Sequence, residues 1–410
     1  MKILIVTSFF PLSNKDEIPQ FLLEQVKALT DYYPHAEIVV LTTSREGNID
    51  EKISDNVTIK RFSYFRPIRK QNLTSMGILP AIKKGKLNLL QLPLFFFFEY
   101  LAIAKELKRF RPDYIYSHWF LPQGLLCYWL AKRYKVSHVF TSHSYDVEIC
   151  KRVPFVGGHI VRSAINSMKA VTVVSQRTLD GIAQFYSKEQ WDIISNKFKV
   201  IPMGVNLPEK NECESYEVFK ELKGLKDKKI IFFMGRFVAK KGINILLQAM
   251  LKLVYVDRSI ILVLAGNGIL REEIELSIIE LGLSENVLMP GFITSQDKDS
   301  YLRIADIYVL PSIESKDGDR EGLPVSLLES MSYGKVCIGT IESGAGEVLI
   351  SGENGFLCRG GDSCLLFDEI QKALGLSSPE YQRIAQNALE TAKSYSWPQI
   401  ISKQAKHFFE

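Results

Sequence analysis

The chain has 410 residues, of which 46% are hydrophobic and 24% are charged, so it can bury large cores, and its length favours two domains over one. Residues 1–205 hold 28 Lys and Arg against 17 Asp and Glu, whereas residues 206–410 hold 23 against 29. The basic half favours an anionic partner, but we expect no nucleic-acid binding, because no RNA- or DNA-binding module is recognisable and the second half is acidic.

The opening run MKILIVTS is expected to be a buried β-strand, not a signal peptide. Its apolar stretch is short, and Asp16 and Glu17 follow it without a small-residue cleavage site. The six cysteines form no CxxC motif, so we expect reduced thiols in a cytoplasmic protein. Since no run of 18 apolar residues is present, we expect no membrane-spanning segment.

The first half alternates strand-like runs with helical segments. Residues 18–29 (IPQFLLEQVKAL) have helical spacing, and the further strands are expected at 36–42, 56–62, 112–117, 138–142 and 170–175. Runs of β-branched residues that alternate with amphipathic helices are typical of parallel βαβ units. Such a sheet binds ligands at the carboxyl ends of its strands.

The polar segment 203–228 interrupts this pattern, and a second series of strands follows it. These strands are expected at 229–236, 259–266, 286–292, 306–312 and 335–340. We therefore predict an α/β protein of two doubly wound Rossmann-like domains that face a cleft, at 1–205 and 206–394. The end of the chain, 395–410, is expected to be an amphipathic helix that packs back on the first domain, with Ser396 as its N-cap and Pro398 in its first turn.

The segment 56–98 contains no Asp or Glu and ends in the run LNLLQLPLFFFF. Its basic residues are Lys60, Arg61, Arg66, Arg69, Lys70, Lys83, Lys84 and Lys86. One interpretation is a core helix beside a solvated basic loop. The other is a surface that rests on anionic lipid at the inner face of the plasma membrane, with Lys and Arg at the headgroups and aromatic rings at the interface.

Residues 317–330, DGDREGLPVSLLES, place carboxylates before and within an otherwise apolar helix. Pro324 suits the first helical position, and the free amides there favour an anionic ligand. Glu321 precedes the helix, and Glu329 is expected about two turns inside it, roughly 10 Å along the axis. Two carboxylates so far apart suit the two ends of one elongated, hydroxyl-bearing ligand such as a nucleoside-diphosphate sugar. Glu329 could alternatively be a solvent-facing helix residue.

A second motif, residues 232–247, places Arg236 after a strand and Lys241 at the opening of a helix. A forked guanidinium and a point charge both suit a diphosphate, although Lys240 and Lys241 could also form a solvated turn. The spacing is not that of a P-loop. The runs LAGNG and PGF (Gly266, Gly268, Gly291 and Phe292) are expected at the same rim of the sheet.

Two histidines follow neighbouring strands of the first half. His118 comes directly after one strand, and His143 and Asp146 come after the next. A single histidine is more often structural, but two at adjacent strand ends indicate a site.

These motifs resemble the large family of retaining nucleotide-sugar glycosyltransferases with the GT-B fold, of the family 4 type. The resemblance rests on an E-x7-E element (Glu321 to Glu329), on a G-R-x4-K-G element (235–242), on His118 in PDYIYSHW and on the segment SGAGEVLISGENGFL. It covers nearly the whole chain. Within the family, DGDREGLPVSLLES is similar to exopolysaccharide transferases of the colanic-acid type.

The resemblance implies a role for each matching residue. Gly235, Arg236 and Lys241 would neutralise the donor diphosphate, with Gly266 and Phe292 nearby, and Glu329 would hold the ribose. Glu321, with the backbone of Gly322 and Leu323, would act on the donor sugar, and His118 would line the reaction centre. His143 and Asp146 would bind the acceptor. The family often has Gly-Gly in its first loop, where the backbone approaches the donor phosphate, whereas this chain departs from that pattern with FFPLSNKDEIPQ.

The expected reaction is hexosyl transfer from a nucleoside-diphosphate sugar to a glycan or lipid-linked saccharide, with retention, in polysaccharide biosynthesis. We expect no cofactor and no metal, because cationic side chains and helix amides can stabilise the leaving diphosphate; Asp317–Asp319 spells DxD but is interpreted as a loop feature. The alternatives are a nucleotide-sugar 2-epimerase, a phosphorylase or another GT-B enzyme without a glycan acceptor, and, less favoured, a lipid- or glycan-binding module.

Overall fold

The computed structural model describes residues 1–8, 10–11, 20–44, 50–74, 78, 81, 85–143, 147, 150–151, 156–209, 214–315 and 318–410. These residues form two compact units. Unit 1 takes in the described parts of Met1–Leu12 and Ile18–Pro202 together with Ile400–Glu410, and unit 2 takes in Met203–Gln399. The change from one unit to the other at Pro202–Met203 lies at the start of the polar segment 203–228.

Unit 1 is built on an eight-stranded sheet of order β3-β4-β2-β1-β5-β6-β7-β8. Every neighbouring pair is parallel except β3 and β4, which pair antiparallel at one edge. Strand β3 was not predicted from the sequence, because three of its four residues are polar and the strand is largely exposed. The strands are β1 (Lys2–Val6), β2 (Glu37–Thr43), β3 (Glu51–Ser54), β4 (Val57–Phe62), β5 (Tyr114–His118), β6 (Ser137–Ser142), β7 (Ala170–Val173) and β8 (Phe198–Val200).

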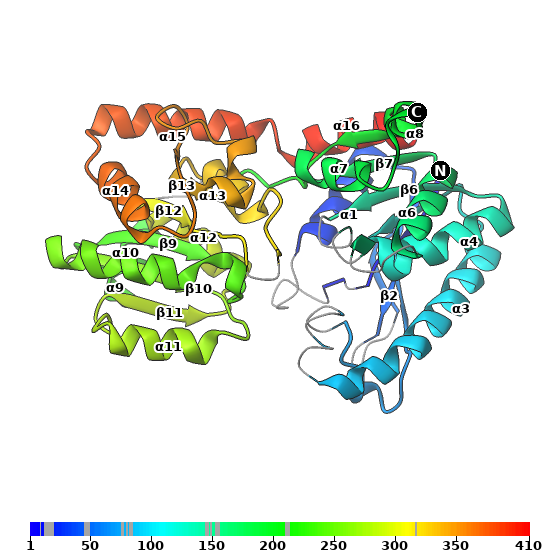
Figure 1. Ribbon diagram of the computed structural model, residues 1–410, viewed down its shortest axis with the longest axis horizontal. Coiled ribbons are helices and arrows are strands. Elements are labelled where there is room, and N and C mark those ends of the chain that lie inside the picture. The colour runs from blue at the N-terminus through cyan, green and yellow to red at the C-terminus, as the bar shows by residue number, and fades with distance from the viewer. Residues whose placement is uncertain are drawn as a thin grey trace. The chain divides into compact units, whose positions relative to one another are not determined.

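Helices cover both faces of this sheet (Figure 1). On β5, Ile115 packs into a cluster with side chains of α3 and α4. The next residue, Tyr116, points to the opposite face, where it bonds Gln25 of α1 and meets the ring of Phe408 of α16. The helices of this unit are α1 (Phe21–Tyr32), α3 (Leu92–Phe110), α4 (Leu125–Tyr134), α6 (Val156–Ser167), α7 (Gln176–Ala183), α8 (Lys188–Ile194) and α16 (Trp397–Phe408), with short turns η1 (Ile68–Lys70), η2 (Lys86–Gln91), η3 (Phe120–Gly124) and η4 (Ser195–Lys197).

Helix α16 is tied to unit 1 by polar contacts as well as by Phe408. Gln25 Nε2 donates to Gln404 Oε1 at 2.9 Å, and His407 Nε2 lies 2.9 Å from the Lys197 carbonyl oxygen. These contacts join the last two turns of the helix to α1 and to the start of β8, as an amphipathic terminal helix requires.

Unit 2 has a six-stranded sheet of order β11-β10-β9-β12-β13-β14, in which every pair is parallel. The apolar runs predicted between residues 229 and 340 all form strands, because both faces of a parallel sheet are buried and such strands are apolar throughout. The strands are β9 (Lys229–Met234), β10 (Ile260–Ala265), β11 (Val287–Gly291), β12 (Ile307–Leu310), β13 (Val336–Thr340) and β14 (Phe356–Cys358).

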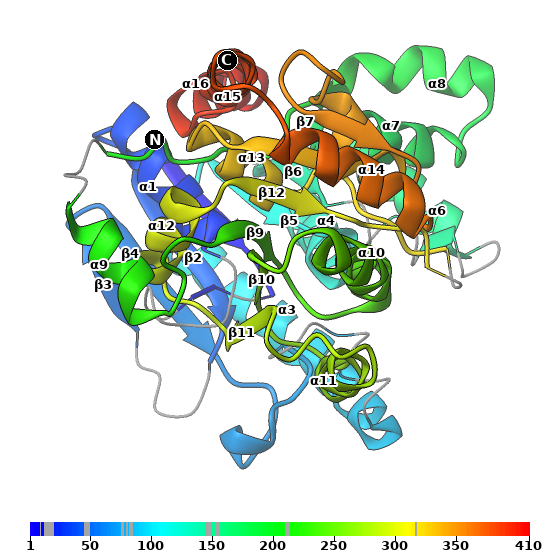
Figure 2. The ribbon, with the colours of Figure 1, turned by 90° about the vertical axis from the view of Figure 1, so that its left-hand side faces the viewer.

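Alternate residues of β9 show how the layers of unit 2 form. Ile231 and Phe233 pack with α10, α11 and α14, whereas Ile230 and Phe232 pack with α12, α13 and α15. Figure 2 shows α10, α11 and α14 to the right of the strands and α12 to the left. The helices are α9 (Glu214–Leu222), α10 (Ile243–Val256), α11 (Arg271–Glu280), α12 (Ser295–Ile304), α13 (Val325–Ser332), α14 (Ser363–Leu374) and α15 (Ser378–Lys393), with turns η5 (Ala239–Lys241), η6 (Ile341–Ser343) and η7 (Ala345–Glu347).

Both sheets are doubly wound, so the predicted fold class is confirmed. In unit 1 the chain runs outward from β1 through β2 and later returns to β5 on the other side of β1. In unit 2 it runs outward from β9 through β10 and returns to β12. The carboxyl ends of β1 and β5, and of β9 and β12, are therefore the switch points at which such sheets bind ligands.

Helix α3 bears on the expectation that no segment spans a membrane. The stretch Leu87–Phe110 is long enough and apolar enough to cross a membrane by length and composition, with a mean hydropathy of 1.6 over its 18-residue window. Only 22% of that window is buried. The sequence criterion of 18 consecutive apolar residues missed it, because single polar residues interrupt the run without lowering its mean hydropathy below that of a spanning helix.

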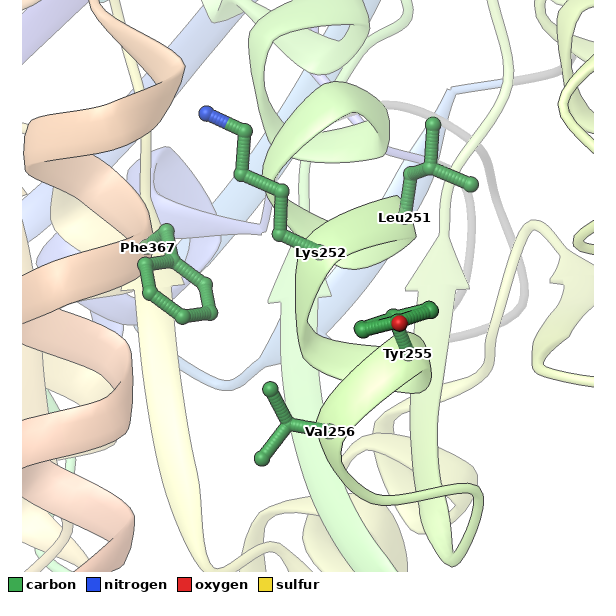
Figure 3. Close-up of a pocket in the computed structure, with 5 residues that line it drawn as sticks. All are labelled: Leu251, Lys252, Tyr255, Val256 and Phe367. Carbon is green, nitrogen blue, oxygen red and sulfur yellow. The ribbon is translucent and has the colours of Figure 1, made fainter.

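A shallow apolar hollow lies on the outside of unit 2 between α10 and α14 (Figure 3). Tyr255, which is 94% exposed, lies on one side of it, and Phe367 of α14 lies on the other. None of the residues predicted to form a functional site lines this hollow.

Candidate functional site

The carboxyl end of β9 leads into a tight turn that positions two of the predicted cations. Gly235 and Arg236 follow the strand, η5 carries Lys241, and α10 begins directly after Gly242. Gly242 has φ +64°, and a Cβ there would lie 2.0 Å from the carbonyl oxygen of Pro311, just after β12. Only glycine fits this approach, which holds the β9 turn against the end of β12.

Lys241 and Glu321 form an ion pair at this rim, although 80 residues separate them. Lys241 Nζ donates to Glu321 Oε2 at 2.7 Å, and the two side chains are only 10% and 12% exposed. Ser312 Oγ contributes a longer bond of 3.4 Å to the same oxygen. Burial opposes ionisation of this carboxyl, but the charges of Lys241, Lys240 and Arg236 outweigh it and hold the pKa of Glu321 below its ordinary value.

Arg236 differs from Lys241 in being exposed. Its guanidinium makes no hydrogen bond or ion pair with the residues that the structure describes, yet it lies close enough to lower the pKa of Glu321. A cation held near a rim without a protein partner is suited to bind a mobile anion.

The loop between β12 and α13 contains further ion pairs. Lys240 Nζ lies 3.1 Å from Asp319 Oδ1, and Arg320 pairs with Glu314. Asp317 of the DxD run lies outside the described residues. Among the residues described, no group of three or more His, Cys, Asp and Glu side chains gathers as a metal site would require.

Helix α13 begins one residue later than predicted. Pro324 is its N-cap, with extended ψ of 128°, and Val325 is the first helical residue. Glu329 is therefore only four residues into the helix, about one turn, and the prediction of two turns was wrong. No side chain caps the helix. The Leu327 amide donates to the Pro324 carbonyl oxygen, which leaves the amides of Val325 and Ser326 open to an anion.

Glu329 forms an ion pair with Lys298, a residue that was not predicted from the sequence. Lys298 Nζ of α12 donates to Glu329 Oε1 at 2.5 Å, and the side chains are 24% and 19% exposed. The alternative of a solvent-facing Glu329 is thereby excluded. Lys298 lies in the polar run SQDKDS, where no local signal distinguishes it from any other exposed lysine.

The backbone of Gly322 and Leu323 is pressed against the segment SGAGE. Gly344 has φ +69°, and a Cβ there would lie 2.6 Å from the Gly322 carbonyl oxygen. This explains why the segment after the E-x7-E element carries glycine.

Gly266 lies at the end of β10, where its amide donates to the Gly291 carbonyl oxygen at 2.8 Å, and Phe292, the residue after Gly291, is 40% exposed.

In unit 1 the predicted histidines come together. His118 ends β5, His143 follows β6, and His118 Nδ1 lies 3.0 Å from His143 Nε2. His118 is wholly buried, and its Nε2 has no partner among the described residues. Burial lowers the pKa of both rings, with the charge of His143 adding to the effect on His118, and the pKa of His143 falls to about 3. Asp146 lies outside the described residues.

A third histidine shows the structural alternative. His138, on β6, is buried, and its Nε2 lies 2.7 Å from Ser117 Oγ within the core. Burial lowers its pKa to about 3. The sequence alone does not distinguish this core histidine from His143. His138 lies within β6 and His143 comes directly after it, and only the fold shows which contacts each ring makes.

Two family models match the chain. The model described as Glycosyltransferase Family 4 matches residues 25–209, and the model described as Glycosyl transferases group 1 matches residues 188–391. The first match lies mainly in unit 1 and the second almost wholly in unit 2.

Curated relatives carry the same description. The putative colanic acid biosynthesis glycosyltransferase WcaL of Salmonella typhimurium is 30% identical over 158 residues, which are 38% of this chain and 37% of that protein. An uncharacterized glycosyltransferase of Methanocaldococcus jannaschii is 28% identical over 302 residues, which are 73% of this chain and 75% of that protein. The matched part thus spans less than half the length of WcaL.

Solved structures share the whole architecture. HepE of Anabaena in complex with UDP superposes with a TM-score of 0.73 at 17% identity and 99% coverage of both chains. WaaG, a glycosyltransferase involved in lipopolysaccharide biosynthesis, superposes with a TM-score of 0.68 at 15% identity and 100% coverage of both. The fold and the family models agree with the motifs, and the chain belongs to the family 4 glycosyltransferases with the GT-B fold.

Proposed function

We propose that this protein transfers a hexosyl unit from a nucleoside-diphosphate sugar to a hydroxyl group of a saccharide acceptor, with retention at the anomeric carbon. The observation that carries the proposal is the rim of unit 2, where Arg236 is exposed beside the buried Lys241–Glu321 pair. The uncapped start of α13 lies on the same chain segment as Glu321. Positive charge and open amides are the features that a leaving diphosphate requires.

In this proposal each group has one task. Arg236, Lys241 and the first-turn amides of α13 stabilise the charge that develops on the diphosphate. Glu329 accepts hydrogen bonds from the ribose, and Glu321 accepts them from the donor sugar. Because these cations supply the charge that a metal would otherwise supply, we propose that the reaction needs no metal ion. The leaving phosphate then takes the proton of the acceptor hydroxyl on the same face, which retains the anomeric configuration.

The ion pairs suggest how the donor is received. Glu321 and Glu329 are each paired with a lysine. A diphosphate that approaches Lys241 would share or take over that cation, and the freed carboxylate would then meet the sugar hydroxyls. Exchange of one charge-assisted bond for another keeps the buried carboxylate satisfied throughout.

We propose a lipid-linked acceptor in exopolysaccharide biosynthesis, and a cytoplasmic protein that rests on the inner face of the plasma membrane. The names of WcaL and of the amylovoran biosynthesis glycosyltransferase of Erwinia amylovora support the pathway class. The surface of α3 and η2 supports the membrane contact: Leu87 is 79% exposed, Leu90 71% and Phe97 56%. The helix is the long cyan one in Figure 1.

Basic residues lie beside this apolar surface. Gln91, next to the start of α3, donates to the Lys70 carbonyl oxygen at 3.0 Å, so η1 with its exposed Arg69 and Lys70 is fastened to the helix. Exposed apolar side chains next to cations suit an anionic lipid surface.

The membrane contact is tested by co-sedimentation with vesicles of anionic or neutral lipid at low salt. Leu90→Ser with Phe97→Ser should reduce binding to anionic vesicles several-fold, and Leu276→Ser, which changes an exposed leucine of α11 in unit 2, should not. Equal binding of all three proteins would contradict the contact.

The reaction itself is tested with a panel of nucleoside-diphosphate sugars. The donor should raise the melting temperature, because it binds the folded state alone. Nucleoside diphosphate should then be released when a lipid extract that contains saccharide carriers is added. The release should be the same with and without EDTA, which removes metal ions. NMR of the product should show the donor's anomeric configuration. A donor that is converted to its 2-epimer without any acceptor would overturn the proposal in favour of an epimerase.

A further inference from the structure

Two consecutive lysines of η5 reach different carboxylates of one chain segment. Lys240 Nζ lies 3.1 Å from Asp319 Oδ1, and Lys241 Nζ donates to Glu321 Oε2 at 2.7 Å. The function proposed above assigns a task to Lys241 and to Glu321. It assigns none to the first pair, although the side chain of Lys240 is held as firmly as that of its neighbour.

Lys240 contacts the chain both shortly after β12 and close to Glu321. Its carbonyl oxygen accepts a hydrogen bond from the Ile313 amide at 2.8 Å. Its ammonium group, besides meeting Asp319, donates to the Arg320 carbonyl oxygen at 3.4 Å. The side chains of Lys240 and Asp319 are only 14% and 21% exposed, so this pair is shielded from the solvent that weakens most surface ion pairs.

Further bonds join the two ends of the same segment to each other. The Ser315 amide and its Oγ both donate to the Asp319 carbonyl oxygen, at 2.9 and 2.8 Å, and Arg320 pairs with Glu314. These bonds connect residues 314–315 with residues 319–320. Lys240 then ties the connected residues to η5, the turn that carries the proposed diphosphate ligand Lys241.

The arrival of a donor makes this attachment important. When a diphosphate takes over Lys241, the Glu321 carboxylate gives up its 2.7 Å bond, and its bond to Ser312 Oγ is long, at 3.4 Å. A freed carboxylate can meet sugar hydroxyls only if its backbone stays in place. Lys240 holds the two residues directly before Glu321, through contacts that the diphosphate does not replace.

We propose that Lys240 is a positioning residue for the donor sugar: it holds Asp319 and Arg320, and thereby keeps Glu321 in reach of the sugar hydroxyls while Lys241 binds the diphosphate. The inference rests on the function proposed above and deepens it. Asp319, which belongs to the DxD run, acts here as the partner of a lysine.

Calorimetric titration with two probes tests the role. The probes are the nucleotide sugar of the panel above that most raises the melting temperature, and the nucleoside diphosphate of the same base. Lys240→Met and Asp319→Ala each break the ion pair, yet they change the net charge in opposite directions. Both should raise the Kd of the nucleotide sugar on the order of tenfold, about one hydrogen bond to the sugar. The Kd of the nucleoside diphosphate should change less than about threefold.

Two further variants separate the role from general damage. Lys240→Arg keeps a cation that can reach Asp319 and should recover most of the affinity for the nucleotide sugar. Lys229→Met breaks a different ion pair of unit 2, that of Lys229 with Asp257 at the start of β9, and should leave both affinities unchanged. Equal weakening of both probes in Lys240→Met, or opposite shifts in Lys240→Met and Asp319→Ala, would overturn the proposal, since these results indicate direct phosphate binding or a plain charge effect.

Charge reversal keeps the contact testable without any ligand. A wild-type protein that binds no member of the panel would defeat the proposed function, and the melting temperatures would still decide whether Lys240 holds Asp319. Lys240→Glu and Asp319→Lys should each lower the melting temperature by at least about 2 °C, and the double variant should restore most of the loss. A double variant that melts no higher than the single variants would overturn the positioning role.

Discussion

Replacing Glu99 with Gln should change how the stability of unit 1 depends on pH. Glu99 lies on α3 and is wholly buried, with one carboxyl oxygen 2.7 Å from Gln123 Nε2. The other oxygen has no hydrogen-bond partner among the described residues. Burial raises the pKa of Glu99 from 4.5 to about 8, against the smaller lowering effect of the Gln123 hydrogen bond. The folded protein therefore holds a neutral carboxyl at pH 7, where the unfolded chain holds an ionised one.

The sign of the effect follows from the protons that each state binds. Between pH 4.5 and pH 8 the folded state binds more protons than the unfolded state at this residue, so the free energy of unfolding falls as pH rises. The full slope is about 1.4 kcal/mol per pH unit for one group. From pH 5 to pH 8 the wild-type protein should lose roughly 3 kcal/mol of stability through Glu99 alone, and below pH 4.5 this loss disappears.

Urea unfolding followed by tryptophan fluorescence at pH 5 and pH 8 measures the effect. Gln is neutral at both pH values and keeps the shape of the side chain, so Glu99→Gln should gain roughly 3 kcal/mol relative to the wild-type protein between pH 5 and pH 8, while the buried histidines contribute equally to both proteins. Phe95→Leu, a change in another buried residue of α3, alters only apolar volume and should lower stability equally at both pH values. If wild type and Glu99→Gln kept the same pH dependence, the reasoning about the buried carboxyl would be refuted.

Two further predictions concern unit 2. Lys241→Met leaves the buried Glu321 carboxylate without its 2.7 Å partner, so we expect a loss of stability of about 3 kcal/mol and weaker nucleotide binding. Denaturant unfolding measures the stability, and calorimetric titration with a nucleoside diphosphate measures the binding. Unchanged values in both measurements would count against the role of the ion pair. Gly344→Ala forces a Cβ to within 2.6 Å of the Gly322 carbonyl oxygen at φ +69°, and it should lower the free energy of unfolding by at least about 1 kcal/mol. The control variant Gly346→Ala meets no atom within 4 Å and should be tolerated. Equal melting temperatures of the two variants would contradict this account.

The sequence predicted the sheets well because parallel strands are apolar throughout. The runs at 36–42 and 259–266 were identified on that basis, and both form central strands. The edge strand β3 was missed, since its polar residues face solvent and carry no such signal. The start of α13 was predicted one residue early, because proline is common at the first helical position, whereas here Pro324 caps the helix.

The motifs located the candidate site but not its contacts. Glu321 and Lys241 were both predicted to meet a ligand, whereas the structure pairs them with each other. A pair 80 residues apart depends on how β9 and β12 adjoin, which no local pattern reveals. The burial of His118 and the role of Lys298 likewise follow from packing between elements, and a single sequence contains no signal for either.

A crystal structure with a bound nucleoside diphosphate is the most direct test of the central claim, that Arg236, Lys241 and the start of α13 together hold the donor's diphosphate. We predict phosphate oxygens within hydrogen-bonding distance of the Arg236 guanidinium, the Lys241 ammonium group and the first backbone amides of α13. A diphosphate bound away from these groups, or held to the protein only through a metal ion, would contradict the account.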